Sequence, residues 1–388
     1  MLTAQTDHTG SASTGQGARR YRYAMISSEI RRDLQRPLGY FQRLDIYHFY
    51  RSAPWNDMKT TEFDARTIRF RLPLDLFRKL WRVRPEIIQG PEPLSLLMLP
   101  FLAATLVYLW LNPQVRLVTL SLEPIPLEKK YHPLIASLFR LILRAWFRRA
   151  AVIFWFDHGS HRNLLANGAP PEKLANVIYG SWGINRDEFS PEGRAVVAAP
   201  TSDPVILYVG RLSPVKGVSY LLDAYRLLLD WGTAAQLAIV GDGPERPRLE
   251  EQARQLGLEG RITWHGSVKN ADLPPYMRAG ALLVLPSVTT KLWVQQLSIT
   301  AWQAMGCGLP VVATDTGCMA EFTPPEVGIL VPERNAAALA DAIATLLSDP
   351  DRRARMATAA RAYAIARFDD RRNVAAAEHA ILEWCQCV

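Results

Sequence analysis

The sequence predicts an α/β protein built from two doubly wound, parallel-sheet domains that face a central cleft. Three observations point to this fold. The chain has 388 residues, which exceeds one ordinary core and fits two domains of about 150–200 residues each. Short apolar runs alternate with helical patterns in both halves, an order typical of parallel sheets covered by helices. A polar segment marked by glycine and proline separates the two halves.

The first domain is predicted over residues 19–180. Residues 1–18 are small and polar, lack the apolar stretch of a signal peptide, and are expected to form a disordered tail. Strand and helix patterns then alternate along the chain. The predicted strands are Tyr21–Ser27, Leu44–Tyr50, Thr67–Leu72, Glu86–Gln89, Arg116–Leu122 and Val152–Phe156, and the predicted helices are Leu74–Val83, Leu94–Leu111 and Pro133–Ala150.

One predicted helix, Leu94–Leu111, is also a candidate membrane span because it holds 18 residues without a charge. It carries Pro100, has no Lys or Arg at either border, and lies between two strands of one apparent strand–helix–strand unit. A spanning helix would place those two strands on opposite sides of a bilayer. We therefore expect a buried core helix, with a membrane segment as the alternative.

The second domain is predicted over residues 204–368, after a linker at 181–203. It is again Rossmann-like, and ligands of such sheets bind beyond the carboxyl ends of the strands. A final helix at 369–388, centred on Asp370–Trp384, has the position to pack back on the first domain, and the sequence alone does not decide whether it does. The expected elements are strands at 205–210, 235–241, 262–266 and 281–286, and helices at 218–231, 245–256, 273–279 and 298–305.

Charge is distributed unevenly between the halves. Residues 1–200 hold 27 Lys or Arg against 17 Asp or Glu, a net charge of +10, whereas residues 201–388 have a net charge of −2. A basic domain suits a polyanionic partner, and an anionic membrane surface is expected rather than nucleic acid, for which no motif is present. Four cysteines (Cys307, Cys318, Cys385 and Cys387) lack metal-ligand spacing and predict reduced thiols in the cytoplasm.

Two basic stretches of the first domain, RKLWRVR at 78–84 and RLILRAWFRRA at 140–150, mix cations with Trp and Phe. Helices that lie in a membrane interface have this composition. The alternative is an ordinary solvated helix face. The stretches therefore suggest, without establishing, a peripheral location on the cytoplasmic face of a membrane.

The segment Gly210–Gly217, GRLSPVKG, lies between a predicted strand and a predicted helix. Gly210 and Gly217 allow a sharp turn and a close approach to a ligand. Arg211 and Lys216 add two cations near a helix N-terminus, which favours anions through its free N–H groups. A diphosphate fits such a turn, and a basic surface turn is the alternative interpretation.

The segment Leu282–Gly317 reads as a strand, a polar loop, a helix, a Gly-x-Gly-x-Pro turn and a second strand. With GRLSPVKG, VGDGPE and HGSV before it, it resembles the donor domain of family 4 glycosyltransferases, also called group 1, which have the two-domain GT-B fold. The resemblance is specific over residues 160–350. Over residues 1–150 it rests only on the alternation of strands and helices.

The resemblance implies roles for individual positions. Arg211 and Lys216 match the cations that bind the donor diphosphate and stabilise its charge during transfer, the catalytic role we assign to them. Val268 matches the region that contacts the nucleotide base. Gln295 matches the first glutamate of a Glu-x7-Glu motif, which holds the transferred sugar, and Gln303 matches the second, which holds the ribose. Backbone amides that face the phosphates match those of Gln296, Leu297 and Ser298.

The motif is therefore Gln-x7-Gln in this chain. A carboxylate accepts hydrogen bonds through two oxygens, whereas a glutamine amide accepts through one oxygen and donates through its nitrogen. The change weakens each site by about 1–3 kcal/mol. AMISSEIRRD and TLSLEP also lack the glycine loop and the histidine that the family often carries there. His158, His161, His265 and the GDGPE turn are interpreted as structural, with His265 in the core.

The sequence thus predicts a glycosyltransferase that moves a sugar from a nucleotide-sugar donor to a glycan or lipid-linked acceptor. By the resemblance, the transfer retains the anomeric configuration, uses no metal or other cofactor, and belongs to polysaccharide or glycolipid biosynthesis. The alternative is a catalytically degenerate GT-B protein that binds a nucleotide sugar or a partner protein without turnover. Phosphorylase-like or epimerase-like chemistry has no supporting residues.

Overall fold

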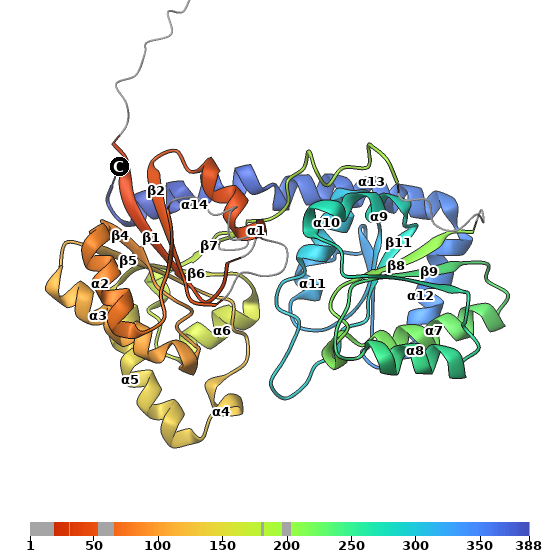
Figure 1. Cartoon of the computed structure of the whole chain (residues 1–388), viewed down its shortest axis with the longest axis horizontal. Coiled ribbons are helices and arrows are strands. Elements are labelled where there is room, and N and C mark those ends of the chain that lie inside the picture. The colour runs from red at the N-terminus through yellow and green to blue at the C-terminus, as the bar shows by residue number, and fades with distance from the viewer. Residues whose placement is uncertain (1–18, 31, 53–65, 180–181, 196–202, 388) are drawn as a thin grey trace, which may run out of the picture.

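A computed structural model describes residues 19–30, 32–52, 66–179, 182–195 and 203–387 of the chain. It contains two parallel sheets, of seven and six strands, each flanked by helices, and the two domains lie side by side (Figure 1). The expected tail at 1–18 and parts of the expected linker lie outside the described residues. The fold class predicted from the sequence, two doubly wound domains, is confirmed.

The first sheet has the strand order β3-β2-β1-β4-β5-β6-β7, and every pair of neighbours is parallel. Its central strands are almost fully buried, as expected for a sheet covered on both faces. Strand β3 is shorter than predicted and ends at Arg69, and the short edge strand β7 was not predicted. The strands are β1 Tyr21–Ser27, β2 Leu44–Tyr50, β3 Thr67–Arg69, β4 Ile87–Gln89, β5 Arg116–Ser121, β6 Ala150–Trp155 and β7 Leu174–Asn176.

Helices cover this sheet through residues spaced for one helical face. In α2, Leu76 and Leu80 are four residues apart and both buried, and the helix ends where Arg84 adopts a left-handed conformation. In α5, Trp146 and Phe147 are fully buried, so the aromatic residues of RLILRAWFRRA belong to the core and do not form a membrane face. The helices are α1 Arg32–Gln35, α2 Pro73–Val83, α3 Leu99–Leu111, α4 Leu127–Lys130, α5 Pro133–Arg149 and α6 His158–Ala166.

The apolar stretch predicted as a helix over Leu94–Leu111 is divided. A short 3-10 turn at Leu96–Met98 precedes α3, and Pro100 occupies the first turn of α3, where its missing N–H breaks no hydrogen bond. Phe101, Leu102 and Leu109 are buried in the domain core. Throughout the described residues, no helix has both the length and the apolarity to cross a bilayer.

The second sheet has the order β10-β9-β8-β11-β12-β13, again parallel throughout. The order reverses at β8, next to β11, which is where doubly wound sheets bind ligands. Half-buried His265 lies in edge strand β10 against Tyr276, so its predicted core position is wrong. The strands are β8 Val205–Val209, β9 Gln236–Val240, β10 Ile262–Gly266, β11 Leu282–Leu285, β12 Val311–Thr314 and β13 Gly328–Val331.

The predicted helices of the second domain are present in the predicted order, and α11, α12 and α13 are additional to them. Ser298 caps α10 by accepting a hydrogen bond from the backbone N–H of Ala301 and is not itself helical. The helices are α7 Val218–Asp230, α8 Arg246–Gln255, α9 Pro274–Ala279, α10 Ile299–Gly306, α11 Met319–Phe322, α12 Ala336–Ser348, α13 Pro350–Phe368 and α14 Asp370–Trp384.

The last two helices run from the second domain to the first (Figure 1). Phe368, at the end of α13, stacks on Trp302 with ring centroids 4.1 Å apart. Asp369 then breaks the helix and caps α14. Helix α14 packs on the first sheet, where Val374, Ala377 and Ile381 are fully buried. One continuous chain segment therefore joins the two cores.

The anchor of α14 is the buried carboxylate of Glu378. It accepts hydrogen bonds from the backbone N–H groups of Gln42, Arg43 and Leu44, at 3.1, 2.7 and 2.9 Å. Gln42 and Arg43 lie just before β2, and Leu44 is its first residue. Their backbone N–H groups are hydrogen-bonded by a side chain from α14 and not by a side chain of their own turn. The α14 helix and the start of β2 are therefore held together by one charged group.

We expect Glu378→Ala to lower the free energy of unfolding of the first domain by about 2–4 kcal/mol, because it leaves buried N–H groups without an acceptor. Urea and thermal unfolding measure this loss. Glu383→Ala is the matched control on the same helix, since its side chain is exposed. Equal stability of the two variants would show that the Glu378 contacts contribute nothing.

Candidate functional site

The loops after β8 and β11 meet at the carboxyl end of the second sheet. Gly217 has a φ of +63°, and a Cβ there would lie 1.9 Å from the carbonyl oxygen of Pro286. The backbone N–H of Val288 also donates to the carbonyl of Val215 at 2.9 Å. Only glycine fits this contact. The turn Gly210–Gly217 is thereby held directly against the segment that carries the Gln-x7-Gln motif.

Lys216 and Gln295 form the centre of this junction. The Lys216 Nζ donates to Gln295 Oε1 at 3.0 Å, and Ser287 Oγ donates to the same oxygen at 3.1 Å. Gln295 Nε2 donates to the carbonyl of Leu297 at 2.6 Å. The glutamine is buried, with 6% of its surface exposed. Its amide orientation is thus determined by two donors on one side and one acceptor on the other.

Burial lowers the pKa of Lys216 to about 8, because the charged form loses hydration. The ammonium also lies over the ring of Trp293, 4.8 Å from its centroid. Among the described residues its side-chain hydrogen bond goes to a neutral amide and no carboxylate pairs with it. A glutamate at 295 would neutralise this cation, whereas glutamine leaves its charge available for an anionic ligand.

Arg211 lies at the other end of the same turn and is exposed. Its backbone is held in place: the carbonyl of Arg211 accepts a hydrogen bond from Tyr208 Oη at 3.0 Å. The next residue, Leu212, exchanges backbone hydrogen bonds with Asp242 and Glu245, at 3.0 and 3.1 Å. The GDGPE turn therefore supports the Arg211 turn, as its structural interpretation predicts.

The turn after β12 supports the backbone of Gln295. Gly317 has a φ of +59°, and a Cβ at this position would lie 1.8 Å from the carbonyl oxygen of Gln295. The same carbonyl oxygen accepts a hydrogen bond from the backbone N–H of Cys318 at 3.1 Å. Cys318 Sγ contacts the carbonyl of Gln296. Leu297 packs on the domain core, and Ser298 caps α10. The turn at residues 314–317, with Cys318 after it, therefore holds the backbone of Gln295 and Gln296 in place through these contacts.

Gln303 has different neighbours. It is buried in α10, with 3% of its surface exposed, and its Nε2 lies 3.4 Å from Asn270 Oδ1. Asn270 follows half-buried Val268 closely in the chain, so this part of the motif adjoins the predicted base-contacting region. Gln303 also lines a cavity of only about 30 Å³ with Arg36 of the first domain. No described hydrogen bond joins Gln303 to Gln295.

A second cavity, of about 520 Å³, opens between the domains. Its walls follow the carboxyl ends of β5 and β6 in the first domain and of β11 and β12 in the second. Charges of both signs line it. The residues are Pro124, Ile125, Pro126, Lys129, Asp157, Gly159, Arg162, Thr289, Thr290, Lys291, Val294, Gly317 and Glu321.

Two acidic residues of this cavity have defined positions. Glu321 of α11 bridges the domains, because its carboxylate accepts from the backbone N–H of His158 at 3.1 Å and pairs with His158 Nδ1 at 2.7 Å. Asp157 caps α6 through Oδ1, while its buried Oδ2 has no partner among the described residues. Burial raises the pKa of Asp157. Sequence reasoning missed both residues, since only folding brings 157 next to 321.

Solved structures that resemble this chain over nearly its whole length confirm the GT-B fold. Sucrose-phosphate synthase from Thermosynechococcus elongatus superposes with a TM-score of 0.73 at 19% identity, over 95% of this chain and 100% of that one. HepE from Anabaena, in complex with UDP-glucose, superposes with a TM-score of 0.70 at 20% identity, over 95% and 100%. At this identity the likeness establishes the fold.

Residues 189–363 match the family model described as glycosyl transferases group 1. Alpha-D-kanosaminyltransferase from Streptomyces kanamyceticus is 36% identical over 214 residues, 54% of each chain. D-inositol 3-phosphate glycosyltransferase from Xylanimonas cellulosilytica is 31% identical over 195 residues, 46% of this chain and 45% of that one. The chain spans about half the length of the curated relatives it matches.

The Lys216–Gln295 contact predicts a measurable titration. Lys216 is expected to lose its proton near pH 8, and Gln295→Glu is expected to raise this pKa by at least about one unit, because a carboxylate favours the charged amine. NMR of the lysine Cε–Hε groups, assigned with Lys216→Arg, measures both values. An unchanged pKa in Gln295→Glu would show that the two side chains are not in contact.

Proposed function

We propose that this chain is a glycosyltransferase that moves a sugar, most simply a hexose, from a nucleotide-sugar donor to a glycan or lipid-linked acceptor. The observation that carries the proposal is the half-buried cation of Lys216, which has no carboxylate partner among the described residues and faces the loop of the Gln-x7-Gln motif. Arg211 adds a second cation to the same turn. Together they are suited to a diphosphate, whose charge increases as the sugar leaves.

The rest of the site is assigned by its position around this turn. Gly210 and Gly217 shape the turn, the region of Val268 is proposed to contact the base, and Gln303 the ribose. Gln295 is proposed to face the transferred sugar, with the backbone of Gln296, Leu297 and Ser298 towards the phosphates. We further propose retention of anomeric configuration and transfer without a metal or other cofactor, as in the family that the sequence resembles.

The acceptor is proposed to enter the cavity between the domains. Its polar groups come from both domains, and Asp157 carries a buried carboxylate oxygen without a partner in the described part of the chain. Because this oxygen is already desolvated, a small shift of the side chain that brings it to an acceptor hydroxyl would add a hydrogen bond at little further cost. Asp157 would therefore position the acceptor beside the donor site.

We also propose that the protein works at the cytoplasmic face of a membrane, in polysaccharide or glycolipid biosynthesis. The supporting observation is a set of exposed apolar side chains on the basic first domain, which suits an anionic interface. They lie on α2, α3 and α5: Leu74, Trp81, Val107, Trp110, Leu134, Leu138 and Leu141.

A degenerate protein that binds without turnover is the second candidate, and one observation favours it. The amide of Gln295 already makes three hydrogen bonds inside the protein, so it has less capacity left for sugar hydroxyls than a carboxylate would have. The two candidates agree on donor binding. They differ in whether donor is consumed.

Turnover with a panel of UDP-, GDP- and ADP-sugars and membrane extracts, measured as nucleotide release, separates the two candidates. We expect release by the native chain, with and without EDTA. Lys216→Ala is expected to weaken nucleoside diphosphate binding about 10- to 100-fold, and the matched control Arg355→Ala, an exposed cation on α13, to leave it unchanged. Binding without release, with release restored by Gln295→Glu/Gln303→Glu, would establish the degenerate protein instead.

Asp157→Asn tests the acceptor assignment. Asparagine retains the oxygen that caps α6, so the helix is preserved, but the partnerless oxygen becomes an amide nitrogen. We expect a rise of about 10-fold or more in the KM for acceptor with donor affinity unchanged. Asp349→Asn, the same change at the cap of α13 outside the cleft, is the control. Equal acceptor kinetics in both variants would remove Asp157 from the site.

A further inference from the structure

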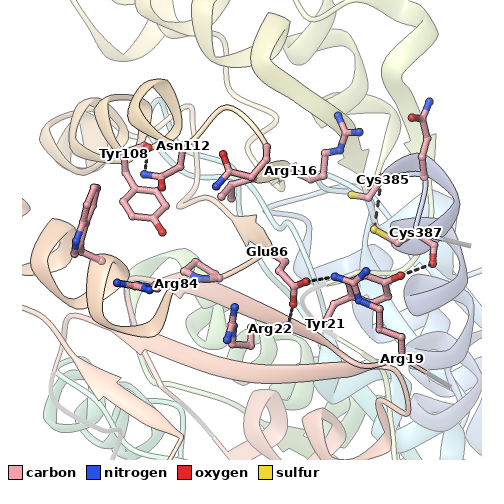
Figure 2. A pocket seen from close by; sticks show the side chains of 15 residues that line it. Arg19, Tyr21, Arg22, Arg84, Glu86, Tyr108, Asn112, Arg116, Cys385 and Cys387 are labelled. Atoms are coloured by element: carbon pink, nitrogen blue, oxygen red, sulfur yellow. Dashed lines mark hydrogen bonds and ion pairs between the residues drawn. The ribbon is translucent and has the colours of Figure 1, made fainter. Parts of the chain in front are cut away.

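A cavity of about 610 Å³ lies at the opposite edge of the first sheet from the cleft. Its walls come from the amino ends of β1, β4 and β5, the carboxyl ends of α2 and α3, and the residues after α14 (Figure 2). The donor and acceptor sites lie instead beyond the carboxyl ends of strands. The cavity is therefore separate from the proposed glycosyl-transfer site, and its volume is in the range of small-molecule pockets.

Four arginines and one glutamate supply the charge of this cavity. Arg19 is held by the carboxylate of Glu86 at 2.6 Å and lies over the ring of Tyr21. Glu86 also accepts from the backbone N–H of Arg22 at 3.1 Å, so both of its oxygens are engaged. Among the described residues, no acidic side chain pairs with the guanidinium groups of Arg22, Arg84 and Arg116, which is an excess of three cations. The arginines are Arg19, Arg22, Arg84 and Arg116.

Tyr108 and Cys385, which also line the cavity, carry no negative charge that would compete with an anionic ligand for the arginines. The hydroxyl of Tyr108 points into the space beside Arg22 and Arg84 (Figure 2), and burial raises its pKa, so it stays protonated. Its ring is fixed edge-on by Phe77 and Trp81, with centroids 6.0 and 6.1 Å away. Across the cavity, beside Arg116, burial raises the pKa of Cys385 to about 12. No thiolate therefore competes for the cations.

We propose that this cavity binds a phosphate group, carried either by a soluble phosphate ester or by a phospholipid headgroup. Guanidinium groups bind phosphate through paired, charge-assisted hydrogen bonds. Arg22 of β1 and Arg84 at the end of α2 lie with the hydroxyl of Tyr108 on one side of the cavity, and Arg116 of β5 adds a third positive charge across it (Figure 2). Two guanidinium groups and a hydroxyl from different elements suit the several oxygens of one phosphate group. The remaining volume holds the glycerol or sugar portion against Trp81, whose ring is about half exposed.

Binding to the full chain tests the proposal with two probes. Isothermal titration with glycerol 3-phosphate measures the soluble source. Co-sedimentation with phosphatidylcholine vesicles, with and without phosphatidic acid, measures the lipid source. Saturable binding of glycerol 3-phosphate supports a soluble ligand, and saturable binding only to vesicles with phosphatidic acid supports a headgroup. Binding of neither probe overturns the proposal.

Variants assign the binding to the cavity. Arg22→Gln/Arg84→Gln is expected to weaken it about 10- to 100-fold. Arg78→Gln/Arg82→Gln, which removes two exposed cations from the same helix α2 outside the cavity, is expected to change it less than about 3-fold. Tyr108→Phe keeps the packed ring and is expected to weaken binding about 3- to 10-fold. Equal losses in the two arginine pairs, with no loss in Tyr108→Phe, would show diffuse charge attraction and overturn the site.

Discussion

The hydrogen bond between Lys216 and Gln295 is the contact on which the site in the second domain depends. It joins the loop after β8 to the loop after β11, the two neighbouring strands at which the order of the sheet reverses. Removing an ammonium from water, even in part, is costly unless it is compensated, and the half-buried Lys216 has an amide oxygen and an aromatic face as its contacts. The charge of Lys216 is therefore not neutralised by a carboxylate among the described residues, whereas a glutamate at position 295 would neutralise it.

The position of the two domains depends on a different set of contacts. The segment from α13 to α14 carries the stacked Phe368 and Trp302 in one core and the buried Glu378 in the other. Glu321 and His158 add a polar contact across the cleft. The cleft thus has a continuous covalent and apolar connection on one side and the hydrogen-bonded contact between His158 and Glu321 on the other.

Much of the fold was predictable because local patterns determine it. The strands and helices of both domains follow from runs of apolar residues and from glycine and proline at their ends. Differences arose where tertiary contacts decide burial. The stretch 140–150 was interpreted as a membrane-interface helix or a solvated face, but its Trp146 and Phe147 fill the core, and His265 was placed in the core but lies on an edge strand. In the site, the turn with Arg211 and Lys216 was predicted, whereas Asp157, Glu321 and the arginine cavity were not, because their residues come from distant elements.

The sequence by itself determined the order of most strands and helices, the excess of positive charge in the first half, and the presence of Gln295 and Gln303 eight positions apart. Each of these is a property of neighbouring residues or of composition. Only the tertiary structure decided that Lys216 contacts Gln295, 79 positions away, while Gln303 faces Asn270 instead. The physical reason is that hydrogen bonds and desolvation act over a few ångströms in space, and only the packed chain brings these side chains within that distance.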